Sequence, residues 1–159
     1  MMYILDTNII RTLLNYYPKK GKRYEAVWEK IDEKIEEGVF ISVDECYREL
    51  TKHYSDKSEQ YQWIHNRKEM FKNPNNQESI IISQLFTYPK MRESIHQKNI
   101  LENRPSADAY LVAKAKVLGA VVVTEEKMKP HSAQLPNLCE KLSVMCIDYD
   151  DFMEVLDEL

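Results

Sequence analysis

The sequence is poor in cysteine and has no long apolar segment. Its three cysteines, Cys46, Cys139 and Cys146, include no pair at CxxC spacing. This scatter argues against a disulfide framework or a zinc site, fits a reducing cytosol and leaves the cysteines as small buried apolar residues. No apolar run approaches the roughly 20 residues that span a bilayer, and the apolar part of the N-terminus is too short for a signal peptide. The sequence therefore predicts a cytoplasmic chain without membrane contact.

Internal repeats and low-complexity linkers are also missing. At 159 residues the chain fits one domain, 1–159, that is long enough to bury a core. The net charge is −4, but six of the 26 acidic residues lie between Asp148 and Glu158, so the rest carries 20 acids against 22 bases. Because a metal site brings its own positive charge, this balance does not exclude a nucleic-acid partner.

The apolar segments that are present predict an α/β fold. Residues 3–6, 39–42 and 144–147 have the pattern of short strands, and 120–124 is a continuous β-branched run, typical of a strand covered on both faces. We expect a three-layer α/β/α sandwich around a mainly parallel sheet of four to five strands. Helical spacing predicts helices over 24–37, from 44 onward, from Pro105 to 118, and over 138–142 and 151–159.

The middle third of the chain, residues 51–104, has the weakest pattern. Ragged helical stripes around 61–71 and 80–86 predict two or three helices there. The clearest break between them is the Asn- and Pro-rich segment 73–76. The layout of this third is not determined by the sequence.

Five acids fall where the expected topology brings distant segments together. Asp6 ends the first strand, and Glu45 and Glu49 share one face of the helix after the second. Asp108 lies in the first turn of a later helix, and Glu126 follows the strand after it. The ligand crevice of an open parallel sheet lies outside the carboxyl ends of its strands. Carboxylates without histidine or cysteine suit Mg²⁺ or Mn²⁺, which would support attack on a phosphodiester.

Each acid also has a purely structural explanation. Asp108 suits the dipole of its helix, Glu45 can form a capping box with Ser42, and Glu126 can belong to an ordinary charged loop. Asp6 is harder to explain in this way, because an unpaired acid buried at a sheet edge costs several kcal/mol. The joint placement of the acids therefore carries more weight than any one of them.

Four fragments of the sequence resemble the PIN domain, in its order and at its approximate spacing. The chain also has the D-E-x-x-x-E-L pattern, the VT-x-E-K loop and the late Cys-Ile-Asp of one PIN-like subfamily. PIN domains are metal-dependent nucleases, and many are the toxins of bacterial or archaeal toxin–antitoxin pairs. The four fragments are LDTNI at 5–9, EL at 49–50, ADAYLVAKA at 107–115 and VVVTEEK at 121–127.

The resemblance implies roles for the acids. Asp6, Glu49 and Asp108 match the first three acids of the PIN pattern. Glu126 stands where most PIN domains have aspartate, and its longer arm can shift a metal or replace a direct bond by a water-bridged one. Glu45 has no clear counterpart and is an alternative or an assistant to Glu49.

Two polar residues and a set of partners are implied in the same way. Asn8 matches the residue that orients the first acid, and Thr124 matches the hydroxyl at a strand end. The implied activity is a Mg²⁺- or Mn²⁺-dependent endoribonuclease that cuts single-stranded RNA, with an antitoxin protein as a partner and room for a homodimer.

Basic and aromatic residues near the acids are the candidates for holding RNA. Each cluster can equally be a solvated face. The candidates are the basic loop Lys19, Lys20, Lys22 and Arg23, the pair Arg67–Lys68, the run from Lys127 to Lys129, and the rings of Tyr16, Tyr17 and Trp63.

Three other functions stay open. A PIN fold retained for binding without catalysis is favoured by the glutamate at position 126. A haloacid-dehalogenase-like phosphatase fits Asp6 after a strand, but that chemistry needs a second acid where Asn8 stands. A receiver-like phospho-acceptor domain needs a paired acid beside the first strand.

Overall fold

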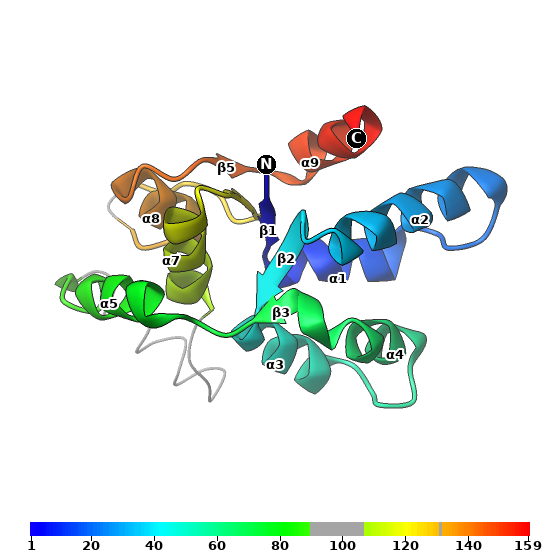
Figure 1. Ribbon diagram of the computed structural model, residues 1–159, viewed down its shortest axis with the longest axis horizontal. Coiled ribbons are helices and arrows are strands. Elements are labelled where there is room, and N and C mark those ends of the chain that lie inside the picture. The colour runs from blue at the N-terminus through cyan, green and yellow to red at the C-terminus, as the bar shows by residue number, and fades with distance from the viewer. Residues whose placement is uncertain (90–106, 131) are drawn as a thin grey trace.

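The computed structural model describes residues 1–89, 107–130 and 132–159. Within them, five strands form one sheet in the order β3-β2-β1-β4-β5, and every neighbouring pair is parallel (Figure 1). The expected parallel sheet is confirmed. Its strands are β1 (Tyr3–Leu5), β2 (Phe40–Val43), β3 (Phe71–Lys72), β4 (Val121–Val123) and β5 (Cys146–Ile147).

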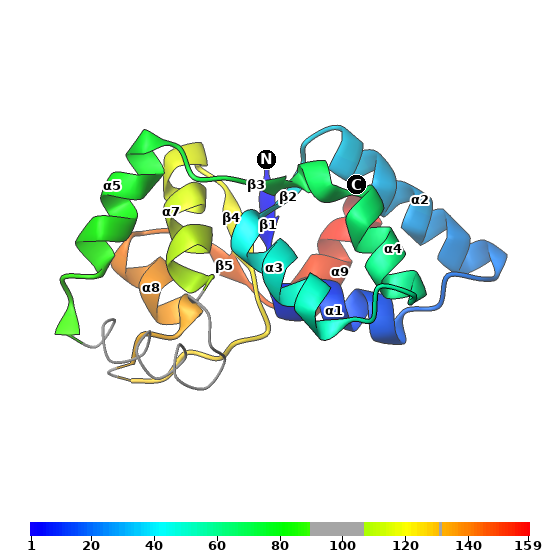
Figure 2. The same ribbon diagram turned by 90° about the horizontal axis from the view of Figure 1, so that it is seen from below.

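Helices cover both faces of the sheet. Figure 2 shows α5, α7 and α8 on one side and α1, α2 and α9 on the other, which confirms the three-layer α/β/α architecture. Pro105, where we expected α7 to begin, lies outside the described residues. The helices are α1 (Thr7–Tyr16), α2 (Lys22–Glu36), α3 (Asp44–His53), α4 (Glu59–Asn66), α5 (Asn76–Leu85), α7 (Asp108–Leu118), α8 (Leu135–Lys141) and α9 (Tyr149–Glu158), with a 3₁₀ turn at Lys68–Met70.

The core lies on both faces of the central strands. On the side of α9, the Phe40 and Phe152 rings pack 5.1 Å apart, and both side chains are fully buried. On the other side, Leu111 of α7 and Leu135 of α8 are fully buried. The three valines of β4 are buried, as a strand covered on both faces requires.

The structure adds two elements that the sequence did not predict. Helix α1 follows β1 directly, with Asp6 as its N-cap. Strand β3 begins at Phe71, the last residue of the segment 61–71 that we expected to be helical, and it pairs in parallel with β2. Helix α1 carries a readable apolar stripe of Ile9, Ile10, Leu13 and Leu14, whereas the two-residue strand β3 has no readable periodicity.

Two local expectations are wrong. Ser42 and Glu45 form no capping box, because the Ser42 hydroxyl donates to the Leu5 carbonyl at 2.6 Å and the N-cap of α3 is Val43. The basic segment is not wholly a loop, since Lys22 and Arg23 lie in the first turn of α2.

Several boundaries also differ from expectation. Helix α8 begins three residues earlier, and α9 begins at Tyr149 rather than at 151. Strand β5 keeps only the last two of the four residues that we assigned to it.

No helix in the described ranges is long and apolar enough to cross a membrane.

Candidate metal centre

Asp6 occupies the point where β1 ends and α1 begins. It is 5% exposed, and both of its carboxylate oxygens are hydrogen-bonded. The backbone N–H of Thr7 donates to Oδ1 at 2.7 Å, and the Thr124 hydroxyl donates to Oδ2 at 2.7 Å. The parallel pairing of Leu5 with Val123 makes this second contact possible, because it aligns the residues that follow each strand. Asp6 is therefore held in one orientation at the carboxyl edge of the sheet.

Two further acids meet Asp6 at this edge. Asp108 is buried in the first turn of α7, and Glu126 is half-buried two residues beyond Thr124. Each of the three carboxyl groups offers an oxygen, and these oxygens lie within 4.8 Å of one another. Three segments that are far apart in the sequence thus place carboxylate oxygens around one small volume.

The electrostatics of Asp6 reflect this crowding. Burial raises its pKa well above the ordinary value, and the negative charges of Asp108 and Glu126 raise it further. The hydrogen bonds from Thr124 and Thr7 oppose this shift but do not cancel it. A bound cation would oppose this shift, because a nearby positive charge favours the ionised carboxylate.

Glu49 lies next to this group but is not part of it among the described residues. The Thr7 hydroxyl donates to its Oε2 at 2.6 Å, while the Thr7 backbone N–H donates to Asp6. Burial raises the pKa of the Cys46 thiol, and the charges of Asp6 and Glu49 raise it further. Thr7 thus bridges the second expected acid to the first.

Glu45 is buried on the same helix as Glu49. Within the described part of the chain, its Oε2 has no hydrogen-bond partner. Burial raises its pKa, and the Arg48 charge partly opposes that shift. Glu45 does not join the three-acid group, but its charge adds to burial in raising the pKa of Tyr110 in α7.

Through its hydrogen bonds, Thr124 links Asp6, at the end of β1, to the loop that carries Glu126. Its oxygen accepts the Glu126 backbone N–H at 3.1 Å and the Asn8 side-chain amide at 3.4 Å. The side-chain oxygen of Asn8, Oδ1, in turn accepts a hydrogen bond from the Glu125 backbone N–H at 3.1 Å. Asn8 and Thr124 are therefore placed to orient acids rather than to bind a metal themselves.

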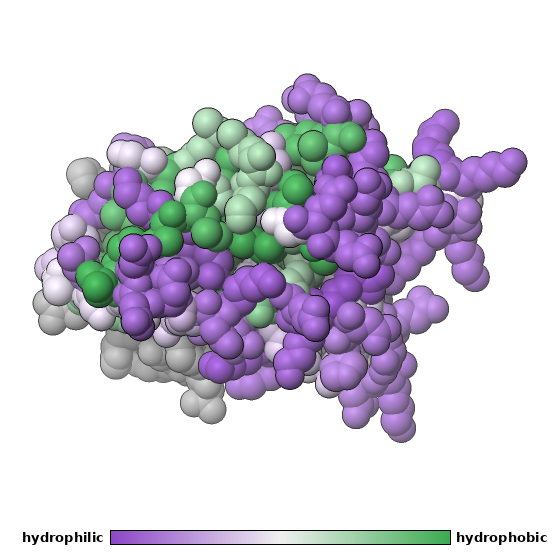
Figure 3. Space-filling view, in the orientation of Figure 1, coloured by the Kyte–Doolittle hydropathy of each residue, from purple (hydrophilic) through white to green (hydrophobic). Residues whose placement is uncertain are grey.

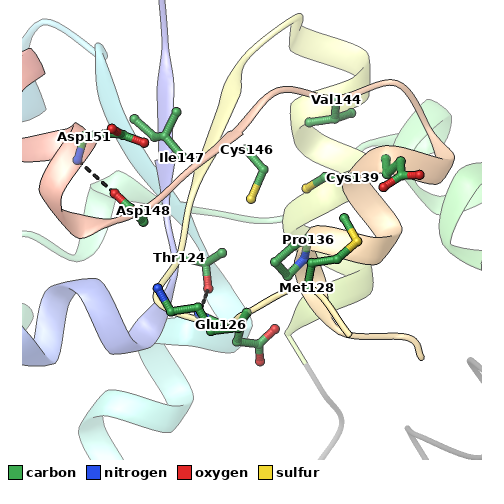
Figure 4. A pocket seen from close by; sticks show the side chains of 12 residues that line it. Thr124, Glu126, Met128, Pro136, Cys139, Val144, Cys146, Ile147, Asp148 and Asp151 are labelled. Carbon is green, nitrogen blue, oxygen red and sulfur yellow. Dashed lines mark hydrogen bonds between the residues drawn. The ribbon is translucent and has the colours of Figure 1, made fainter. Parts of the chain in front are cut away.

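The Glu126 side chain is fixed by α8. Its Oε2 accepts the Leu135 backbone N–H at 2.8 Å, which satisfies one of the free donors at the start of that helix. Glu126 and Thr124 line a cavity of about 340 Å³ that Cys139 and Cys146 also line (Figure 4).

Sequence reasoning did not find Thr7 or Leu135. Thr7 could have been found from its position between Asp6 and Asn8, because a hydroxyl directly after a helix cap can reach a neighbouring helix. The second involves a backbone N–H, which has no sequence signature.

The structure divides the basic and aromatic candidates for RNA binding into residues that are exposed and residues that are engaged within the fold. Lys20, Lys22, Arg23 and Lys127 are exposed, and Lys19 lies over the Trp28 ring at 5.4 Å.

Two candidates are already engaged within the fold. The Trp63 ring is buried against Trp28, so it is not available to stack on a base. Arg67 forms a two-point ion pair with Asp32 at 2.7 and 2.9 Å.

A family model described as "Domain of unknown function (DUF4411)" matches residues 3–158. No curated protein matches the chain.

Solved structures share its fold at low identity. VapBC-1 from nontypeable Haemophilus influenzae is 19% identical, with a TM-score of 0.52, over 94% of this chain and 99% of that one. VapBC2 from Rickettsia felis, bound to a DNA fragment from its promoter, is 14% identical, with a TM-score of 0.51, over 94% and 100%. PAE2754 from Pyrobaculum aerophilum is 16% identical, with a TM-score of 0.50, over 100% and 98%. The PIN-type fold expected from the sequence is confirmed.

Proposed function

The chain belongs to the DUF4411 family, and from its carboxylate centre we propose that it is a Mg²⁺- or Mn²⁺-dependent endoribonuclease that cuts single-stranded RNA. The observation that carries the proposal is the meeting of Asp6, Asp108 and Glu126 within 4.8 Å at the carboxyl edge of the sheet. This edge is where open parallel sheets bind their ligands.

The residues present fit a hard divalent cation. Asp6, Asp108 and Glu126 supply only oxygen donors, which suit Mg²⁺ or Mn²⁺ and disfavour Zn²⁺. Burial and the charges of Asp108 and Glu126 raise the Asp6 pKa, and a cation between these carboxylates would favour their ionised forms. A cation held here would lower the pKa of a bound water and stabilise charge on a phosphoryl oxygen.

The chain's own residues orient that chemistry. Thr7 and Thr124 donate to the two oxygens of Asp6 and hold it in one rotamer. Leu135 does the same for Glu126 through its backbone N–H. We assign Glu49, held by the Thr7 hydroxyl, as the fourth acid, with Glu45 as its assistant.

We also propose that the protein is the toxin of a toxin–antitoxin pair and has an antitoxin protein as its partner. Similarity in fold to the VapBC structures supports this role.

An exposed apolar surface gives independent support for a protein partner. Met1, Leu118 and Met145 are exposed close to the amino-terminal ends of β1, β4 and β5. Figure 3 shows apolar surface gathered on one face of the molecule. Apolar patches of this kind mark protein interaction sites, for an antitoxin or for a second copy in a homodimer.

The test of the proposed function is metal dependence. Cleavage of a single-stranded RNA oligomer should appear with Mg²⁺ or Mn²⁺ and vanish in excess EDTA, because every proposed ligand is an oxygen. A DNA oligomer of matched sequence is the substrate control, and we expect it to be cut more slowly. Full activity in EDTA would contradict the metal mechanism, and a preference for DNA would contradict the substrate assignment.

The basic segment at the end of α1 should bind RNA without taking part in the chemistry. Helix α1 has ten residues and is about 15 Å long, so this segment lies one helix length from Asp6. Neutralising Lys19, Lys20, Lys22 and Arg23 together should weaken RNA binding and lower the salt slope by up to about 3.

A single-charge control is Lys116→Gln, at an exposed position in the last turn of α7. It should leave binding and slope unchanged in filter-binding titrations at several salt concentrations. An unchanged slope in the quadruple variant would show that RNA does not run along this segment.

One observation favours the non-catalytic alternative. The hydrogen bond from Leu135 gives Glu126 a structural task that needs no metal. A binding module would bind RNA equally well with and without EDTA and would leave it intact.

The phosphatase alternative loses support from the structure. Asn8, which stands in place of its second acid, is engaged with Thr124 and the Glu125 backbone.

A further inference from the structure

Two of the three cysteines form a thiol pair beside the metal centre. Cys139 lies in α8 and Cys146 in β5, and their side chains point toward one another (Figure 4). The two thiols are close enough that each shifts the pKa of the other. The backbone holds the pair in place, because the Val144 N–H donates to the Cys139 carbonyl at 2.8 Å and Cys146 is in register with Val122 of β4.

The pair is coupled to Glu126 through α8. Both thiols line the cavity of about 340 Å³ that Glu126 also lines. Leu135, whose N–H holds the Glu126 carboxylate, lies four residues before Cys139 and so on the same face of that helix. A displacement of α8 at Cys139 would therefore also move the Leu135 N–H that holds the Glu126 carboxylate.

The two sulfurs differ in access and reactivity. Cys146 is partly exposed, whereas Cys139 is 1% exposed. The pKa of Cys146 is lowered chiefly by its pairing with Cys139, and the pKa of Cys139 is raised by the same pairing, by burial and by the charges of Asp108 and Glu126. Cys146, the more exposed thiol, is therefore the one that an oxidant reaches first, and the buried Cys139 is the resolving thiol.

We propose that Cys139 and Cys146 form a reversible disulfide, a modification site that weakens cation binding at the neighbouring carboxylates. The oxidant is a low-molecular-weight disulfide such as oxidised glutathione. The Cys146 thiolate attacks one sulfur of that disulfide and expels a glutathione thiolate, which leaves a mixed disulfide on Cys146. Cys139 then loses its proton, attacks the Cys146 sulfur and expels the second glutathione thiolate. The protein loses two electrons and two protons, and oxidised glutathione becomes two molecules of glutathione.

The second half of the proposal rests on the proposed function. The S–S bond is about 2.05 Å long, shorter than any contact between two thiols, so its formation draws α8 toward β5. Because α8 supplies the N–H that orients Glu126, this movement displaces one carboxylate of the cation site. A weaker cation site follows from the displaced ligand.

Alkylation after unfolding tests the disulfide itself. The intact chain is equilibrated in glutathione buffers of increasing oxidation, unfolded and treated with N-ethylmaleimide. The reduced chain should carry three labels and the oxidised chain one, on Cys46, with a cross-linked peptide that joins the other two cysteines. Three labels in fully oxidising buffer, or a bond that involves Cys46, would overturn the proposal.

Calorimetric titration with Mn²⁺ tests the consequence. We expect at least a threefold weaker affinity in the oxidised chain, restored by reduction and desalting. The control Cys146→Ser should show the same affinity in both buffers. A disulfide without a change in affinity would overturn the coupling but not the modification site. Absence of Mn²⁺ binding in the reduced chain would instead overturn the proposed function, while the label count would still decide the disulfide.

Discussion

Asp6→Asn should abolish metal-dependent RNA cleavage and at the same time stabilise the metal-free protein. Loss of a residue that merely orients a ligand costs about 10- to 100-fold in metal affinity or activity, so loss of a ligand should cost more than about 100-fold. The amide retains one oxygen to accept the Thr7 N–H, and its NH₂ can donate to Thr124, so the fold is preserved.

The stabilisation should depend on pH in a defined direction. Burial and the charges of Asp108 and Glu126 raise the pKa of Asp6 in the folded state. Folding therefore favours the protonated acid, and its contribution to stability is fully present below the ordinary aspartate pKa, about 3.9. That contribution is lost as the pH rises through the raised pKa. The variant removes this loss, so its gain in Tm over wild type should be larger at pH 7 than at pH 4.

Asp150→Asn is the matched control, because Asp150 is an exposed acid in the first turn of α9. It should keep wild-type cleavage and show no such pH-dependent gain. Thermal melts in EDTA and single-turnover cleavage in Mn²⁺ measure the two effects. If Asp6→Asn and Asp108→Asn both cleave at the wild-type rate, the roles proposed for these acids are wrong.

Lys114→Met should destabilise the protein by about 3–5 kcal/mol, the cost of leaving one partner of a buried ion pair without its counter-charge. Lys114 of α7 lies 2.7 Å from Oε1 of Glu78 in α5, and the two side chains are 7% and 2% exposed. The Lys114 ammonium also donates to the Asn73 carbonyl at 3.2 Å. The pair therefore joins α5 to the helix that carries Asp108.

The double variant Glu78→Leu with Lys114→Met should recover most of this loss. A buried ion pair can often be replaced by apolar residues at no net cost, whereas breaking it strands a charge. Lys116→Met, on an exposed face of α7, should stay within about 0.5 kcal/mol of wild type. Urea unfolding measures all three. A double variant as unstable as Lys114→Met would show that lost packing, not the stranded charge, causes the effect.

Elements with a strong local pattern were predictable. The β-branched run around β4 and the alternation of apolar strands with amphipathic helices identify a parallel α/β sheet, because both patterns report burial directly. Helix α1 also has such a pattern, in Ile9, Ile10, Leu13 and Leu14, but it was not recognised. Strand β3 was missed because it has no local pattern. Strand β3 has two residues, and only its pairing with β2 makes it a strand.

For the candidate site, the position of an acid at the end of a strand could be predicted from the sequence, but the partners of its side chain could not. Asp6 and Glu126 follow neighbouring parallel strands, so topology alone predicts that they meet. Glu45 shows the limit of local motifs. Its spacing from Ser42 matches a capping box, yet the Ser42 hydroxyl is used by the Leu5 carbonyl of the adjacent strand.

The sequence by itself determined the fold class and the position of Asp6 and Glu126 after neighbouring strands, because burial periodicity and strand-end position are local properties of the chain. Only the tertiary structure decided which acids share one volume and what holds each of them. It joined Glu49 to the Thr7 hydroxyl and Glu126 to the Leu135 N–H, and it placed Cys139 and Cys146 on one cavity. These contacts join segments through hydrogen bonds a few ångströms long, and such distances depend on how helices pack on the sheet rather than on any pattern along the chain.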